Sequence, residues 1–158
     1  MKKECNKLNK KIIFGIISTL FCAMILTGCQ QEQTKTFTQT KNGITLQMEY
    51  TYKGDTVLQQ KATNTMPYAI FPVEKKEDIH FLLDRLSEPY QGIKGVEQSI
   101  DYQEEQAVET VMIDYGELDF DLAKGIDSIF TDGADSEKKV SMQAVEKWLL
   151  EKGFEEIK

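Results

Sequence analysis

Apolar and polar residues alternate strictly along residues 44–53, which read ITLQMEYTYK. The apolar face of this segment holds Ile44, Leu46, Met48, Tyr50 and Tyr52. A period of two residues is typical of a half-buried β-strand. Turn signals lie at both ends, Asn42-Gly43 before the segment and Gly54-Asp55 after it. The pattern therefore predicts three consecutive strands joined by two tight hairpins.

These turns also predict how the three strands pair. With two-residue turns, Phe37 falls opposite Met48 and joins the apolar face, and Lys53 falls opposite Thr56. Val57 then joins the same face, whereas Leu58 points away from it. The third strand, TVLQQKATN, is polar enough to predict an edge of the sheet.

Helical spacing first appears in residues 75–86, where apolar residues recur every three or four positions. The predicted inward stripe consists of Ile79, Leu82, Leu83 and Leu86. The following stretch, SIDYQEEQAVETVMIDY, alternates again and predicts a second pair of strands with its turn near EEQ. Residues 120–129 predict a short helix, and 131–139, TDGADSEKK, a loop.

A last helix is predicted over residues 142–152. Ser141 suits its N-terminal cap and Gly153 its C-terminal end. Val145, Trp148 and Leu149 are expected to face inward, and Phe154 and Ile157 to pack as a final short strand or tail.

Antiparallel strand pairs interspersed with helices predict an α+β fold. We expect a two-layer sandwich, with a mostly antiparallel sheet and amphipathic helices packed on one face. The polar residues up to Lys35 predict a tether covering 29–35, and 36–158 are expected to form a single domain.

The first 28 residues instead predict an export signal. Five lysines lie within residues 2–11, and fifteen mostly apolar residues follow, from Ile12 to Leu26. This run is shorter than the roughly 20 residues that a membrane-spanning helix needs. A cationic start, a short apolar core and small residues at the end are typical of a secretory signal peptide.

The residues Leu26-Thr27-Gly28-Cys29 resemble the lipobox of bacterial lipoproteins. The resemblance implies that the Cys29 thiol receives a diacylglycerol and that a peptidase cuts between Gly28 and Cys29, making Cys29 the new N-terminus. A second acyl chain makes membrane attachment stable where one chain gives only marginal binding. The alternative is an uncut signal anchor with an ordinary cysteine.

Cysteine content and charge narrow the possible chemistry. The other two cysteines, Cys5 and Cys22, lie within the signal, so the mature chain has no disulfide and no cysteine-based nucleophile or metal site. Removing residues 1–28 leaves 14 basic and 25 acidic residues, a net charge of −11. Such an acidic chain argues against nucleic acid and anionic lipid head groups as partners.

Candidate catalytic residues are few. His80 is the only histidine, and we interpret it as a boundary residue. The stretch DYGELDFD contains Asp119 and Asp121, whose carboxylates could serve acid–base chemistry on glycosides. Asp132 and Asp135 are weak candidates for calcium, although their spacing does not fit a calcium loop.

Aromatic residues could line a groove for a peptide or sugar, but core packing is the preferred interpretation because each alternates with apolar neighbours. The residues concerned are Tyr50, Tyr52, Tyr102 and Tyr115. Trp148, at helical spacing with Val145, is expected to lie in the core.

Four segments together resemble the YehR-like lipoproteins, a bacterial family catalogued as a domain of unknown function. They read YTYKGDTVLQQ, GIKGVEQSIDY, VETVMIDYGELDF and VSMQAVEKWLLEKGFEEIK, and with the lipobox they span nearly the whole chain. The resemblance implies a two-layer α+β domain on a lipid anchor. It implies no reaction and no functional residue beyond Cys29.

The leading hypothesis is therefore a non-catalytic lipoprotein without a cofactor. It would be anchored to the outer face of the cell membrane, or to an outer membrane if the host has one, and would bind a small molecule, a peptide or an envelope protein. The alternative is a carboxylate-dependent hydrolase acting on envelope polymers. A third hypothesis assigns a signalling role to the signal-derived peptide FCAMILTG.

Overall fold

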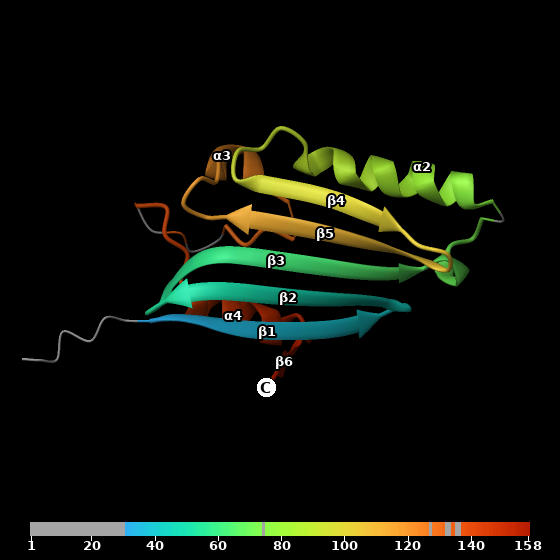
Figure 1. The fold of residues 1–158 in the computed structure, drawn as a ribbon. Helices are drawn as coiled ribbons and strands as arrows, with labels where there is room; N and C mark the ends of the chain where they lie inside the picture. The colour runs from blue at the N-terminus through green and yellow to red at the C-terminus, as the bar shows by residue number, and fades with distance from the viewer. Residues whose placement is uncertain (1–30, 74, 127, 132–133, 135–136) are drawn as a thin grey trace, which may run out of the picture. The chain divides into compact units, whose positions relative to one another are not determined.

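The strands pair in an order that differs from their order along the chain (Figure 1). The computed structural model describes residues 31–158 except 74, 127, 132–133 and 135–136. Within that range the strands form one antiparallel sheet with the order β4-β5-β3-β2-β1-β6. The strands are β1 (Glu32–Lys41), β2 (Ile44–Lys53), β3 (Thr56–Pro67), β4 (Val96–Tyr102), β5 (Gln106–Asp114) and β6 (Glu155–Ile157).

In the described part of the chain, three α-helices and two short 3-10 helices connect these strands. They are η1 (Tyr68–Ile70), α2 (Lys76–Ser87), η2 (Glu88–Tyr90), α3 (Phe120–Ala123) and α4 (Met142–Glu151). The α-helices pack against one face of the sheet, so the predicted two-layer α+β sandwich is confirmed.

The predicted register is correct throughout the first hairpin and next to the turn of the second. Phe37 pairs with Met48 across the first hairpin, and Lys53 pairs with Thr56 across the second. Asn42 and Gly43 both have positive φ, 53° and 81°, as a type I′ turn requires. These local signals sufficed because a two-residue turn determines which residues face each other.

The prediction that the third strand is an edge is wrong, because β3 lies between β2 and β5. A β-bulge at Thr51/Tyr52 shifts the register, so that Tyr52 pairs with Val57 and Thr51 with Gln59. Gln60 then faces the helices and is buried. Its amide donates to the Ser128 carbonyl at 2.7 Å and its oxygen accepts from the Tyr115 hydroxyl at 2.8 Å. These bonds satisfy a polar side chain in the centre of the sheet.

The domain begins earlier than predicted, because β1 starts at Glu32 and the sheet therefore includes residues assigned to the tether. Lys35, on the helix side of β1, donates a hydrogen bond to Glu146 of α4 at 2.6 Å. This contact raises the pKa of Lys35. Residues 32–35 are polar but ordered because they pair with β2, from Glu32 opposite Lys53 to Lys35 opposite Tyr50.

Two hydrophobic clusters lie on the helix-covered face. The larger includes Phe37, Met48, Tyr50, Val111, Phe120, Val145 and Leu149, and brings α3 and α4 onto the sheet. The smaller, beneath α2, consists of Met66, Tyr68, Ile79, Leu83 and Ala107. On the same face, the buried Glu109 accepts hydrogen bonds from Asn64 at 2.9 Å and from Gln98 at 3.0 Å.

Only half of the apolar stripe predicted for α2 faces inward. Ile79 and Leu83 are buried, whereas Leu82 is 40% exposed and Leu86 is 59% exposed. Figure 1 shows α2 beside β4, at the edge of the sheet. A helix at the margin has a narrow contact with the sheet, so residues flanking its central line remain in solvent.

The C-terminal predictions are confirmed in most respects. The Ser141 hydroxyl caps α4 by accepting from the Ala144 amide, and Gly153 follows the helix at a φ of 88°. Asp55 holds this end in place, since it accepts from the Ser141 hydroxyl at 2.6 Å and from the Gln143 amide at 2.9 Å. Phe154 is buried, but Ile157 is 49% exposed. The helix expected within 120–129 is only the single turn of α3.

Tyr50 offers a test of this core. Its hydroxyl is buried and has no hydrogen-bond partner among the described residues, whereas the Tyr115 hydroxyl donates to Gln60. Tyr50→Phe should therefore raise the free energy of unfolding at pH 7 by about 1 kcal/mol, and Tyr115→Phe should lower it by about 1–2 kcal/mol. Urea denaturation of both variants measures the difference. A loss in Tyr50→Phe equal to that in Tyr115→Phe would show that the Tyr50 hydroxyl is hydrogen-bonded.

The two buried tyrosines, Tyr50 and Tyr115, also determine how the stability of the fold depends on pH. Burial raises the pKa of Tyr50 and of Tyr115. A raised pKa in the folded state gives stability that is complete below the unfolded value of about 10 and is lost as the pH rises further. Denaturation at pH 7 and at about pH 10.5 should show a smaller alkaline loss in Tyr50→Phe than in the wild type.

Candidate ligand-binding groove

A groove opens on the helix-covered face of the sheet, where the helices do not cover it completely. It lies between β1 and β2, the segment that follows α3, and the C-terminal part of α4, and it has a volume of about 580 Å³. Its apolar lining includes Leu46, Met48, Ile126, Phe130, Trp148 and Phe154. Met48 and Phe154 are buried, while Leu46, Ile126 and Trp148 are partly exposed. The groove is therefore a partly solvated extension of the larger hydrophobic cluster.

Trp148 and Phe130 form an aromatic wall. Their ring centroids are 5.4 Å apart and their planes are inclined by 55°. Trp148 is the only tryptophan of the chain. Aromatic side chains offer large apolar contact surfaces to a ligand. Because Trp148 lines the groove, its fluorescence should change when a ligand binds there.

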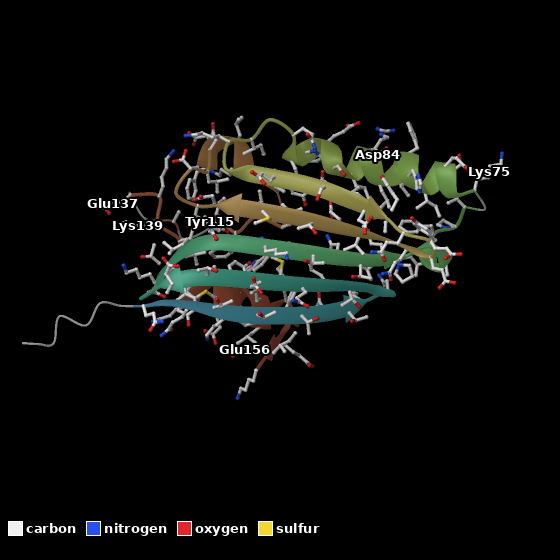
Figure 2. All side chains as sticks on the ribbon, viewed as in Figure 1. Lys75, Asp84, Tyr115, Glu137, Lys139 and Glu156 are labelled. Atoms are coloured by element: carbon white, nitrogen blue, oxygen red, sulfur yellow. The ribbon has the colours of Figure 1, made fainter. Side chains whose placement is uncertain are left out.

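The segment that follows α3 carries Phe130, and buried polar side chains hold its backbone in place. Gln60 donates to the Ser128 carbonyl at 2.7 Å, and Tyr115, which follows the end of β5 (Figure 2), donates to the Phe130 carbonyl at 3.3 Å. The hydroxyls of Ser128 and Tyr90 are 2.7 Å apart. These contacts hold the segment that follows α3 in place beside the sheet.

Two charged side chains are found among the described residues that line the groove, and both are basic. They are Lys41, at the end of β1, and Lys152, just after α4. Neither ammonium group has an ion-pair partner in the described part of the chain. Gln39 donates to the Lys152 carbonyl at 2.7 Å and so holds the end of α4 against β1. The charged groups of this groove are therefore positive, although the chain as a whole is acidic.

A second hollow, of about 490 Å³, lies on the uncovered face of the sheet. Its lining includes both acidic and basic residues, namely Glu49, Lys61, Lys94, Glu97, Asp114 and Glu117. Lys94 and Glu117 form an exposed ion pair at 2.5 Å, and this hydrogen bond lowers the pKa of Glu117. The lining also includes the apolar side chain of Met112, which is 47% exposed, but none of its described residues is aromatic.

The carboxylates of DYGELDFD make local structural contacts. Asp114 accepts from the Gly116 amide at 2.9 Å, within the turn after β5. Asp119 caps α3 by accepting from the amides of Asp121 and Leu122, both at 3.1 Å. Asp121 lies 3.9 Å from Lys138. These contacts describe a turn, a helix cap and a surface ion pair.

The calcium candidates Asp132 and Asp135 lie outside the described residues, as does Cys29. Within the described residues, no three His, Cys, Asp or Glu side chains lie close enough together to hold a metal ion. No helix among those residues is long and apolar enough to cross a membrane.

His80 packs at the boundary of the domain, in line with its interpretation from the sequence. Its ring centroid lies 4.0 Å from that of Tyr102, whose hydroxyl donates to Asp84 of α2 at 2.5 Å. Figure 2 labels Asp84 on α2. Burial and this hydrogen bond raise the pKa of Tyr102. Tyr50 and Tyr115 are buried, and none of the four tyrosines considered earlier lines the groove.

Sequence reasoning missed the groove. It assigned Trp148 to the core, although the side chain packs on the core and also forms a wall. One signal was available, since Gln39 and Lys41 share a face of β1 with Phe37. Polar residues on the apolar face of a strand indicate that helices do not cover that part of the sheet.

The chain is similar over most of its length to proteins named as lipoproteins. The chain is 36% identical over 144 residues to the uncharacterized lipoprotein Lmo0207 of Listeria monocytogenes, covering 90% of this chain and 94% of the relative. It is 33% identical over 147 residues to the uncharacterized lipoprotein YehR of Escherichia coli, covering 92% and 96%. The NMR structure of YehR superimposes with a TM-score of 0.70, covering 82% of this chain and 93% of YehR.

A more distant structure shares the fold alone. The NMR structure of a protein from Streptococcus pneumoniae covers 99% of this chain at 16% identity, with a TM-score of 0.55.

The family model described as a protein of unknown function, DUF1307, matches residues 33–155. The resemblance to YehR-like lipoproteins is thus confirmed, and the chain belongs to the DUF1307 family.

Proposed function

We propose that this protein is a lipid-anchored, non-catalytic binding module outside the cytoplasmic membrane, and that its groove takes an apolar ligand bearing a carboxylate or phosphate group. The observation that carries this proposal is the combination of an aromatic and aliphatic lining with two unpaired ammonium groups, in a chain whose mature charge is −11.

The size and lining of the groove support a small ligand. Its volume of about 580 Å³ lies within the usual range of ligand pockets, about 300–1,000 Å³. Leu46, Ile126 and Trp148 offer apolar surface that is still partly exposed. A ligand that covers this surface gains about 25 cal/mol for each Å² removed from water.

The charges select among apolar ligands. Lys41 and Lys152 line the groove from different elements, so an anionic group between them would meet two ammonium groups. Charge complementarity of this kind contributes mainly to specificity and to the rate of association. A cationic ligand would meet repulsion at the same place.

The N-terminus supports attachment at Cys29. The relatives at 33–36% identity are named lipoproteins, and β1 begins three residues after Cys29. A link of three residues spans at most about 10 Å, so lipid on Cys29 would hold the start of β1 close to the membrane. Lys41 stands nine residues further along β1, about 30 Å away.

The carboxylate contacts described above favour binding over hydrolysis. Asp119, the residue first considered for acid–base chemistry, uses its carboxylate to cap α3. Asp121 is exposed beside Lys138.

Ligand binding can be followed through Trp148. Decanoate, added below its critical micelle concentration to residues 31–158, should change the tryptophan fluorescence saturably. Decyltrimethylammonium should bind more weakly. Lys41→Glu and Lys152→Glu should each weaken decanoate binding about fivefold, or about 1 kcal/mol, whereas Lys53→Glu, the same charge change at an exposed position outside the groove, should leave it unchanged.

Two results would contradict this account. Equal binding of the anionic and cationic amphiphiles would leave a ligand-binding groove but refute its preference for anions. No saturable change with any decyl compound would refute the groove as the ligand site.

The anchor is tested by replacing the proposed acylation site. Cys29→Ser should abolish fatty-acid labelling and cleavage after Gly28, because serine has no thiol to receive diacylglycerol. Cys22→Ser, which changes a cysteine inside the signal, should keep both. Metabolic labelling and mass spectrometry of the mature N-terminus measure the outcome, and normal processing of Cys29→Ser would disprove the anchor.

A further inference from the structure

The outward side of α2 is apolar over its middle turns. Phe81 is 66% exposed, Leu82 40% and Leu86 59%, while Ile79 and Leu83 on the opposite side are buried against the sheet. Figure 1 shows α2 beside β4, where no other labelled element covers its outer side. Large exposed apolar side chains grouped on one helix are typical of protein interaction surfaces.

Two charged residues flank this apolar patch. Asp78 lies one turn before Phe81 and Leu82, and Arg85 lies one turn after them. Arg85 is the only arginine of the chain, and arginine is enriched at protein interfaces. Neither Asp78 nor Arg85 has an ion-pair partner in the described part of the chain.

The order of these residues is self-complementary. Residues 78, 81, 82 and 85 follow the spacing of three and four that forms a single seam along a helix. If two α2 helices lie antiparallel, with a two-fold axis between positions 81 and 82, Phe81 meets Leu82 of the second copy. Asp78 then meets Arg85 of the second copy, and the reverse pair forms at the other end.

We propose that α2 docks on α2 of a second copy of this chain in this antiparallel arrangement. The contact is isologous, since each residue pair occurs twice, and it closes as a dimer without leaving a free surface. The opposite charges at the two ends of the seam select the antiparallel orientation. α2 contributes no residue to the groove, so this contact is independent of the proposed ligand site.

A single helix pair buries less surface than a stable interface requires, so the dimer should be weak in solution. Molecules held on one membrane have a high effective concentration, which favours weak contacts. Cys29 is the only cysteine after residue 28. Coupling it to a maleimide lipid therefore reproduces attachment at the proposed position.

The test compares charge-swapped variants of residues 29–158. Self-association is measured by analytical ultracentrifugation at high protein concentration, with Cys29 blocked, and by energy transfer between labelled copies coupled to vesicles. Asp78→Arg and Arg85→Asp should each weaken association about tenfold, because each creates two like-charge contacts per dimer. The double variant should associate like the wild type, because the pairs form again with their charges exchanged.

Apolar variants test the centre of the seam. Leu82→Asp should abolish association, whereas Leu150→Asp should not, although Leu150 of α4 is similarly exposed at 51%. Circular dichroism confirms that each variant is folded. A wild type that remains monomeric both in solution and on vesicles would overturn the proposal. So would a double variant that associates no better than the single ones.

Discussion

The buried apolar side chains of this sheet fall on one face, and only short helices are available to cover it. The larger cluster and the α2 cluster lie on that same face. The ten residues of α4 span about 15 Å, whereas the ten residues of β2 span about 33 Å. α4 runs along β1, since Lys35 contacts Glu146 and Gln39 contacts Lys152. It begins beside Asp55, at the turn between β2 and β3.

The groove follows from this mismatch in length. The cover provided by α4 ends at Gln39, and Leu46, which pairs with Gln39, is left partly exposed beyond it. The segment after α3 closes the side of the gap because Gln60 and Tyr115 bind its carbonyl groups from beneath. Buried polar groups therefore shape the groove, and the incomplete cover supplies its apolar surface.

The sequence allowed prediction wherever a feature depends on neighbouring residues. Asn42-Gly43 determines the first hairpin, and Ser141 and Gly153 determine the ends of α4, through contacts within a few positions. The central place of β3 could not be predicted in this way, because the burial of Gln60 depends on Tyr115 and Ser128, 55 and 68 residues away. Helical spacing likewise placed Leu82 inward, although α2 lies at the margin of the sheet.

The central claim is that the uncovered part of the apolar face is the ligand site. The most direct measurement is a map of amide and indole chemical shifts in ¹⁵N-labelled residues 31–158 during titration with decanoate. The account predicts the largest shifts at the Trp148 indole, Leu46, Ser128 and Lys152, with little change on the uncovered face of the sheet. Shifts centred on Lys61 and Met112, in the hollow of that other face, would contradict it.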